Sequence, residues 1–122
     1  MAIESNISEL AANASADAVC ALLDDGYLEI YSRGGSLLAE ARLGTRAFGT
    51  ARSGVAVANA IGTAAVESPG IAGSFKAKTK NRDFVFGGSV GTKNADMVLD
   101  ETKLFRGDEL TITDLKYKQR VA

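Results

Sequence analysis

At residues 22–31 the chain reads Leu22-Leu23-Asp24-Asp25-Gly26-Tyr27-Leu28-Glu29-Ile30-Tyr31, and the spacing of its apolar residues changes within this stretch. Before Gly26 apolar residues recur every three or four positions, which is the period of a helix. After Gly26 they alternate, which is the period of a strand, and Leu28 and Ile30 are expected to point inward. The sequence therefore predicts one N-terminal helix followed by a β-rich body.

The helix is predicted over residues 6–25, which corresponds to about five turns. Asn6 and Glu9 have the spacing of a capping box, and Gly26 is expected to end the helix in the left-handed conformation. Glu9, Asn13 and Asp17 are expected on the solvent side. The opposite side is expected to pack either on this chain's sheet or on a neighbouring subunit, and the sequence does not choose between them. Its residues are Ile7, Leu10, Ala11, Ala14, Ala18 and Leu22.

The β-rich body is predicted over residues 27–122, with turn signals roughly every ten residues. Roughly six to eight short strands follow from this spacing, so we expect a mainly β domain, an antiparallel β-sandwich or jelly-roll-like barrel with one N-terminal α-helix. No linker or repeat divides the chain, and residues 1–122 are predicted to form a single domain. The expected elements are a hairpin over 27–43, weakly registered strands over 44–66, a turn at 68–70, a hairpin over 75–86, a short strand at Met97 and Leu99, and a last strand over 109–120 with a bulge near Thr113 and Asp114.

The composition excludes several kinds of chemistry. The 122 residues include no histidine and one cysteine, so Ser-His and Cys-His nucleophiles, intrachain disulfides and cysteine-cluster metal sites are excluded. Cys20 is expected to be a buried, inert thiol. Residues 87–91 match the G-x-S-x-G pattern, but Ser89 has no histidine base and no following helix pattern, so we interpret them as a glycine-rich strand. The sequence predicts no enzyme, no cofactor and no metal site.

Charge is divided unevenly along the chain. The net charge is −1, but residues 1–70 carry 8 acidic and 4 basic side chains (−4), whereas residues 71–122 carry 7 acidic and 10 basic ones (+3). In the basic half, cations alternate with other residues along two expected strands. A solvated outer face explains this pattern, and so does a docking surface for an acidic protein partner. The cations are Lys76, Lys78, Lys80 and Arg82 in the first strand and its turn, and Lys116, Lys118 and Arg120 in the second.

Two other classes of partner are not expected. Nucleic acid would need aromatic residues among the cations and a less acidic chain. No run of apolar residues is long enough to cross a bilayer, and the Ala-rich helix lacks the basic segment that precedes a signal sequence. The sequence therefore predicts neither membrane association nor secretion.

Strand and turn motifs follow one another in a defined order along most of the chain. Because of these motifs and their order, the chain resembles a family of short, β-rich virion proteins of tailed bacteriophages. Genes for such proteins are usually found among head genes. The basic 76–82 hairpin is more charged than is typical of that family. The motifs are Leu22-Leu23 before Gly26–Tyr31, then Leu37–Ala39, Ala47–Gly49, Gly88–Thr92, Ala95–Leu99 and a terminal Gly107-x-x-Leu110-Thr111-Ile112-Thr113-x-Leu115.

The resemblance implies a capsid decoration or cement protein, made in the host cytoplasm and located in the virion. It implies the major capsid protein as partner, and self-association, most simply as a trimer, over joints between capsid subunits. A tail or head-tail junction protein is the alternative of the same class. The alternative of another class is a small module that binds nucleic acid or an acidic protein through its basic strands.

Overall fold

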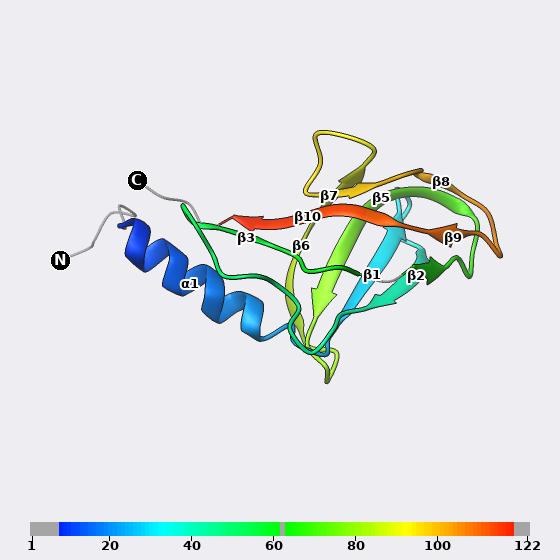
Figure 1. The fold of residues 1–122 in the computed structure, drawn as a ribbon. Helices are drawn as coiled ribbons and strands as arrows, with labels where there is room; N and C mark the ends of the chain where they lie inside the picture. The colour runs from blue at the N-terminus through cyan, green and yellow to red at the C-terminus, as the bar shows by residue number, and fades with distance from the viewer. Residues whose placement is uncertain (1–7, 62, 119–122) are drawn as a thin grey trace.

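The structure, a computed structural model, describes residues 8–61 and 63–118 and confirms a mainly β fold with one helix (Figure 1). The helix, α1, spans Glu9–Ala21 and lies to one side of the strands. In the described residues ten strands follow it. They are β1 Tyr27–Ser32, β2 Leu37–Arg42, β3 Val55–Val57, β4 Ala64–Ala65, β5 Gly70–Lys78, β6 Phe84–Gly91, β7 Met97–Leu99, β8 Lys103–Leu104, β9 Glu109–Leu110 and β10 Ile112–Lys118.

Eight strands form one curled sheet in the order β2-β1-β5-β6-β7-β10-β3, with β8 paired to β5. Neighbouring strands are antiparallel, as predicted, except β6 and β7, which are parallel. At the β2 edge Ala39 bridges to Val66, and the adjacent β4 pairs with β9. The sheet thereby turns back on itself, and β10 passes across β1 and β5 in Figure 1.

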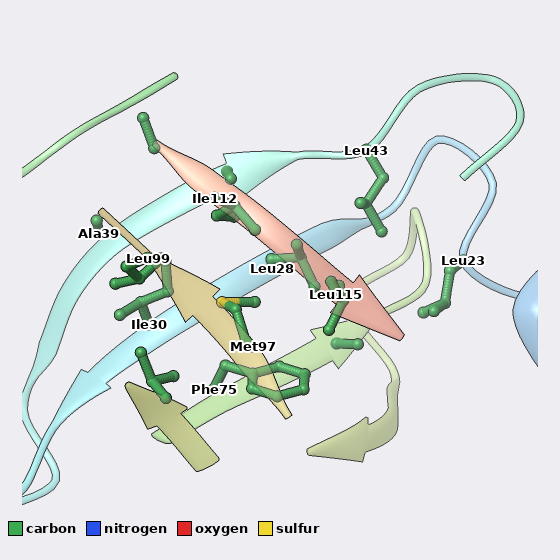
Figure 2. Close-up of a cluster of buried hydrophobic side chains, with 14 of the residues drawn as sticks. Leu23, Leu28, Ile30, Ala39, Leu43, Phe75, Met97, Leu99, Ile112 and Leu115 are labelled. Carbon is green, nitrogen blue, oxygen red and sulfur yellow. The ribbon is translucent and has the colours of Figure 1, made fainter. Parts of the chain in front are cut away.

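The core lies between the two halves of this curled sheet. Figure 2 shows side chains of β1, β7 and β10 converging, among them Leu28, Ile30, Met97 and Leu115, each at most 1% exposed. Burial of one such side chain contributes about 1.5–3 kcal/mol to stability. The inward positions predicted for Leu28 and Ile30 are therefore confirmed.

Both predicted hairpins are confirmed, and so is the bulge in the last strand. The pairing of β10 with β7 shifts register between Ile112 and Asp114. This shift places Ile112 and Leu115 on the same buried side, although they are three positions apart.

The prediction of weakly registered strands over 44–66 is confirmed only in part. In its described part this region contains only two short strands, β3 paired with β10 and β4 paired with β9, and isolated bridges such as Phe48 to Ala58. Small side chains and glycines bury little area and lose much backbone entropy in a strand, so longer ladders are not favoured there.

The ends of α1 also differ from the prediction. Ser8 is the N-cap, and its Oγ accepts a hydrogen bond from the Ala11 N–H at 3.1 Å, whereas Asn6 lies outside the described residues. The left-handed residue after the helix is Asp25, with φ of 59°, rather than Gly26. Gly26 is required for a different reason: a Cβ atom there would collide with the carbonyl oxygen of Lys78. The glycine lets the helix exit lie directly against β5.

Candidate docking surfaces

Helix α1 is held to the body by its polar side. Asn13 Oδ1 accepts a hydrogen bond from the Gly54 N–H at 2.8 Å, and Asp17 Oδ1 accepts one from the Ala51 N–H at 2.7 Å. Just after the helix, Asp24 Oδ1 accepts from the Ala47 N–H at 2.9 Å. Residues 46–54 form little regular pairing, and their N–H groups need acceptors if they are to be buried. The helix provides these acceptors.

Small residues are buried on the side of α1 that faces the body. Ala12, Ala16 and Cys20 are each at most 3% exposed. Burial, with a smaller contribution from the nearby carboxylates of Asp17 and Asp24, raises the pKa of the Cys20 thiol to about 12. A protonated, buried thiol is a poor nucleophile, which agrees with the inert role expected for it.

The side of α1 predicted to pack faces outward. Leu10 is 81% exposed, Leu22 is 56% exposed, and Ala14 and Ala18 are exposed between them. Ile7, assigned to the same side, lies outside the described residues. The alternative in which this side packs on the chain's own sheet is therefore wrong. The N–H groups of residues 46–54 need hydrogen-bond acceptors, so the polar side of α1 faces the body instead. Packing on a neighbouring subunit stays a prediction.

The first basic strand is partly neutralised within the chain. Lys78 Nζ lies 2.8 Å from Glu29 Oε1, and the Tyr31 hydroxyl donates to the same oxygen at 2.6 Å. The Arg82 guanidinium donates to both oxygens of Glu40, at 2.6 and 3.1 Å. Two of the four predicted docking cations, Lys78 and Arg82, thus hold β1, β2 and β5 together across the outer face.

The environment of Glu29 changes two pKa values. Burial by itself would raise the pKa of Glu29, but hydrogen bonds from Lys78 and Tyr31 and the charge of Arg82 outweigh it and lower that pKa. The pKa of Tyr31 rises to about 12, chiefly because its hydroxyl donates to the Glu29 carboxylate. Glu29 is therefore ionised at neutral pH although only 7% of it is exposed.

The other predicted cations remain available on the surface. Lys76 lies with Nζ 5.1 Å from the centre of the Tyr31 ring, and Lys80 is exposed at the hairpin turn. Lys116 and Lys118 are exposed on β10, and only Lys116 has a carboxylate within 4 Å among the described residues, Asp114 at 3.7 Å. Arg120 lies outside the described residues.

A cleft of about 200 Å³ lies between β6 and β10, beside Lys116 and Lys118. Its aromatic wall is a packed cluster in which the Phe86 and Tyr117 ring centres are 4.8 Å apart and those of Phe75 and Phe86 are 6.2 Å apart. Sequence reasoning did not place these residues together, because no local pattern reveals that β6 and β10 are neighbours. The residues lining the cleft are Phe75, Phe86, Gly87, Asp96, Lys116, Tyr117 and Lys118.

Ser89 takes part in a turn contact. Its Oγ donates to Asp96 Oδ2 and accepts from the Asp96 N–H, both at 3.1 Å, and its N–H donates to the same carboxylate at 2.9 Å. These bonds fasten the 92–96 loop against β6. The prediction that residues 87–91 form a glycine-rich strand is confirmed, because they are the end of β6.

Comparison of the chain with protein-family models, with curated proteins and with solved structures found no match. In the described part of the chain, no helix is long and apolar enough to cross a bilayer. Within residues 8–61 and 63–118, no cluster of three or more acidic or cysteine side chains is arranged to hold a metal ion.

Proposed function

We propose that this protein is a non-enzymatic structural component of a tailed-bacteriophage particle, a capsid decoration protein that binds joints between major capsid subunits. The observation that carries this proposal is the outward apolar side of α1, with Leu10 81% and Leu22 56% exposed. A monomer gains nothing from leaving two leucines in water, whereas a second copy gains by covering them.

The attachment of α1 supports the same proposal. The helix is fixed to its own body by partly buried hydrogen bonds to Asn13 and Asp17, so its apolar side is presented on a supported element. A symmetric oligomer places the same side of each copy around one axis. The trimer implied by the resemblance is the arrangement we propose, with the helices at the centre.

The test uses the tailed phage whose genome encodes this protein. The gene is deleted from that phage, and the purified protein is added to the resulting particles. We expect regularly spaced density on the capsid surface in electron micrographs, and greater resistance of the capsid to heat. Density confined to the tail or to the head-tail junction would contradict the decoration role. An absence of binding at saturating protein would contradict any place on the particle.

A variant separates self-association from shell binding. Leu10→Glu with Leu22→Glu alters only the outer side of α1, and Leu37→Glu is a matched control because Leu37 is 40% exposed on β2. We expect the double variant to lose capsid occupancy and the control to retain it. Equal occupancy for the two variants would show that α1 has no role in assembly.

A further inference from the structure

We propose that the outer face of β1, β2, β5 and β6, at the end next to the turn over residues 79–83, binds single-stranded DNA. The inference goes beyond the role in a phage particle and does not rest on it. It rests on aromatic rings and unpaired cations that strand pairing brings to one side of the sheet. Along the chain the cations are not interleaved with aromatic residues, but across the sheet they are.

Three aromatic side chains lie on this outer face. Tyr27 pairs with Lys78, and Lys78 pairs with Phe84, so these three side chains point to the same side of the sheet. Tyr31 follows four positions along β1 and shares the face with Tyr27. Phe84 is 61% exposed, and no cation or second ring of the described residues covers it. Its ring is therefore open to a base.

Arg82 and Tyr27 form a second stacking surface. The Arg82 Cζ atom lies 4.1 Å from the centre of the Tyr27 ring, and both oxygens of Glu40 accept hydrogen bonds from its guanidinium. The Arg82 side chain is still 50% exposed. Bases stack on guanidinium planes as well as on aromatic rings, so a guanidinium held in this way offers a second position for a base.

Three cations around these surfaces are available for phosphates. Arg42 lies with Cζ 5.3 Å from the centre of the Tyr27 ring, Lys76 lies with Nζ 5.1 Å from the centre of the Tyr31 ring, and Lys80 is exposed in the turn. None of the three has a carboxylate within 4 Å in the described part of the chain. They can therefore contact phosphates without giving up an ion pair.

The local charge is positive although the chain as a whole is at −1. The four strands and the turn contain five cations and three carboxylates, which gives a net charge of +2. Two of the carboxylates, Glu29 and Glu40, are neutralised by Lys78 and Arg82, and the third is Asp83 in the turn. Charges more than about 8 Å away are screened at physiological ionic strength, so these local groups decide the attraction.

The combination of rings and cations favours single-stranded DNA over other polyanions. An acidic protein segment would pair with the cations but has no planar group to cover the Phe84 ring. Duplex DNA has its base faces stacked within the helix and offers only phosphates to this surface. Selection of RNA depends on contacts to the 2′-hydroxyl, whereas stacking and phosphate contacts are made equally by DNA.

The experiment measures the fluorescence anisotropy of a labelled oligothymidylate of about twelve nucleotides with the full chain. We expect saturable binding that is at least about tenfold tighter than that of duplex DNA of the same length. With three cations on phosphates, the logarithm of the binding constant should fall with the logarithm of the salt concentration at a slope of about −2. Equal binding of the two DNAs, or no saturation at about 100 μM protein in low salt, would overturn the proposal.

Stacking is tested at Phe84. Phe84→Leu removes the ring and keeps an apolar side chain, so binding should weaken by about tenfold with the salt slope unchanged, whereas Phe84→Tyr should stay within about twofold. The matched control is Phe105→Leu, because Phe105 is 55% exposed with Lys103 above its ring and follows β8, which pairs with the opposite end of β5. Wild-type binding by a Phe84→Leu variant that circular dichroism shows to be folded would overturn the proposal.

Phosphate contact is tested at the lysines. Lys76→Gln with Lys80→Gln removes two of the three cations, so binding should weaken by about tenfold and the salt slope should fall to about −0.7. Lys116→Gln with Lys118→Gln is the control, because both side chains are exposed on β10, and it should stay within about twofold. Equal losses for the two double variants would mean that DNA follows the general charge of the chain, and would overturn the site.

Competition separates DNA from the other polyanions. A peptide of alternating glutamate and valine with the same number of charges should not displace the labelled DNA at equal concentration. Displacement would assign the face to an acidic protein and overturn the proposal. Binding of an oligouridylate at least about tenfold tighter than that of the oligothymidylate would overturn the assignment to DNA.

The outcomes also separate this inference from the particle role. DNA binding by a protein that does not bind capsids leaves the DNA site standing and removes the decoration proposal. Capsid occupancy that is retained by Phe84→Leu, together with no DNA binding by the wild-type protein, does the reverse.

Discussion

Helix α1 and strand β1 differ in where their large apolar side chains lie. β1 turns Leu28 and Ile30 into the core and keeps Glu29 on the outer face, as its alternation predicts. α1 turns Asn13 and Asp17 toward the body and leaves Leu10 and Leu22 in solvent. The main-chain groups of β1 are paired with β2 and β5. Its side chains therefore only have to place apolar groups toward the core and polar groups on the outer face. The helix meets a loop whose N–H groups need acceptors, and this need decides its orientation.

The largest difference between the two regions is expected from leucine truncation. Leu28→Ala leaves a cavity in the core and should lower the free energy of unfolding by about 2–5 kcal/mol. Leu10→Ala, its matched control on the helix, should change it by less than about 0.5 kcal/mol in a dilute monomer. Urea-induced unfolding measures both. Similar losses for the two variants would mean that the outer side of α1 is buried by the monomer itself.

The polar attachment of α1 should have an effect of intermediate size. Asp17→Ala leaves the Ala51 N–H without its acceptor and is expected to cost about 1–3 kcal/mol. Asp17→Asn retains an oxygen at Oδ1 and should recover most of this loss, because the hydrogen bond needs an acceptor rather than a charge. If the alanine variant unfolds at the same urea concentration as the wild-type protein, the Asp17 side chain does not hold the helix to the body.

These contrasts explain what was predictable from the sequence. Alternation in β1 and at residues 75–79, together with the turn signals that follow each, identified both hairpins, because each hairpin pairs strands that are adjacent in the sequence. The bulge near Thr113 was also predictable, because the apolar positions of the last strand change parity there. The side of α1 that packs was not predictable from its apolar spacing, because the demand for acceptors comes from residues 46–54.

The candidate docking residues were also predictable only in part. The exposure of Lys76, Lys116 and Lys118 follows from strand alternation, and that of Lys80 from its place in the turn after β5. The capture of Lys78 by Glu29 was not visible, since it depends on the pairing of β1 with β5. The cleft was not visible either, because it depends on β7 ending before β6 and β10 do.

Acid should lower the stability of the fold through protonation of Glu29 on β1. The folded-state pKa of Glu29 lies below its ordinary value near 4.5, so its ionised form stabilises the fold above that pH. This contribution is lost as the pH falls through the lowered folded-state pKa. Thermal unfolding between neutral pH and pH 2 should show a smaller loss of stability for Glu29→Gln than for wild type. Parallel curves for the two proteins would contradict the assigned partners of Glu29.

The smallest expected signal is the reactivity of Cys20. The thiol is 3% exposed and its pKa is raised to about 12, so it should not react with a disulfide reagent at pH 8 until the protein unfolds. Asp17→Ala should speed the reaction by loosening α1. A wild-type thiol that reacts as fast as free cysteine would show that α1 is not firmly attached.

Self-association through the outward apolar side of α1 is tested most directly by native mass spectrometry. The wild-type protein is compared with the variant that combines Leu10→Glu with Leu22→Glu. We expect wild type to be an oligomer, most simply a trimer, and the variant to be a folded monomer with an unchanged circular dichroism spectrum. A wild-type protein that stays monomeric at micromolar concentration, or a variant that keeps the wild-type mass, would contradict the account.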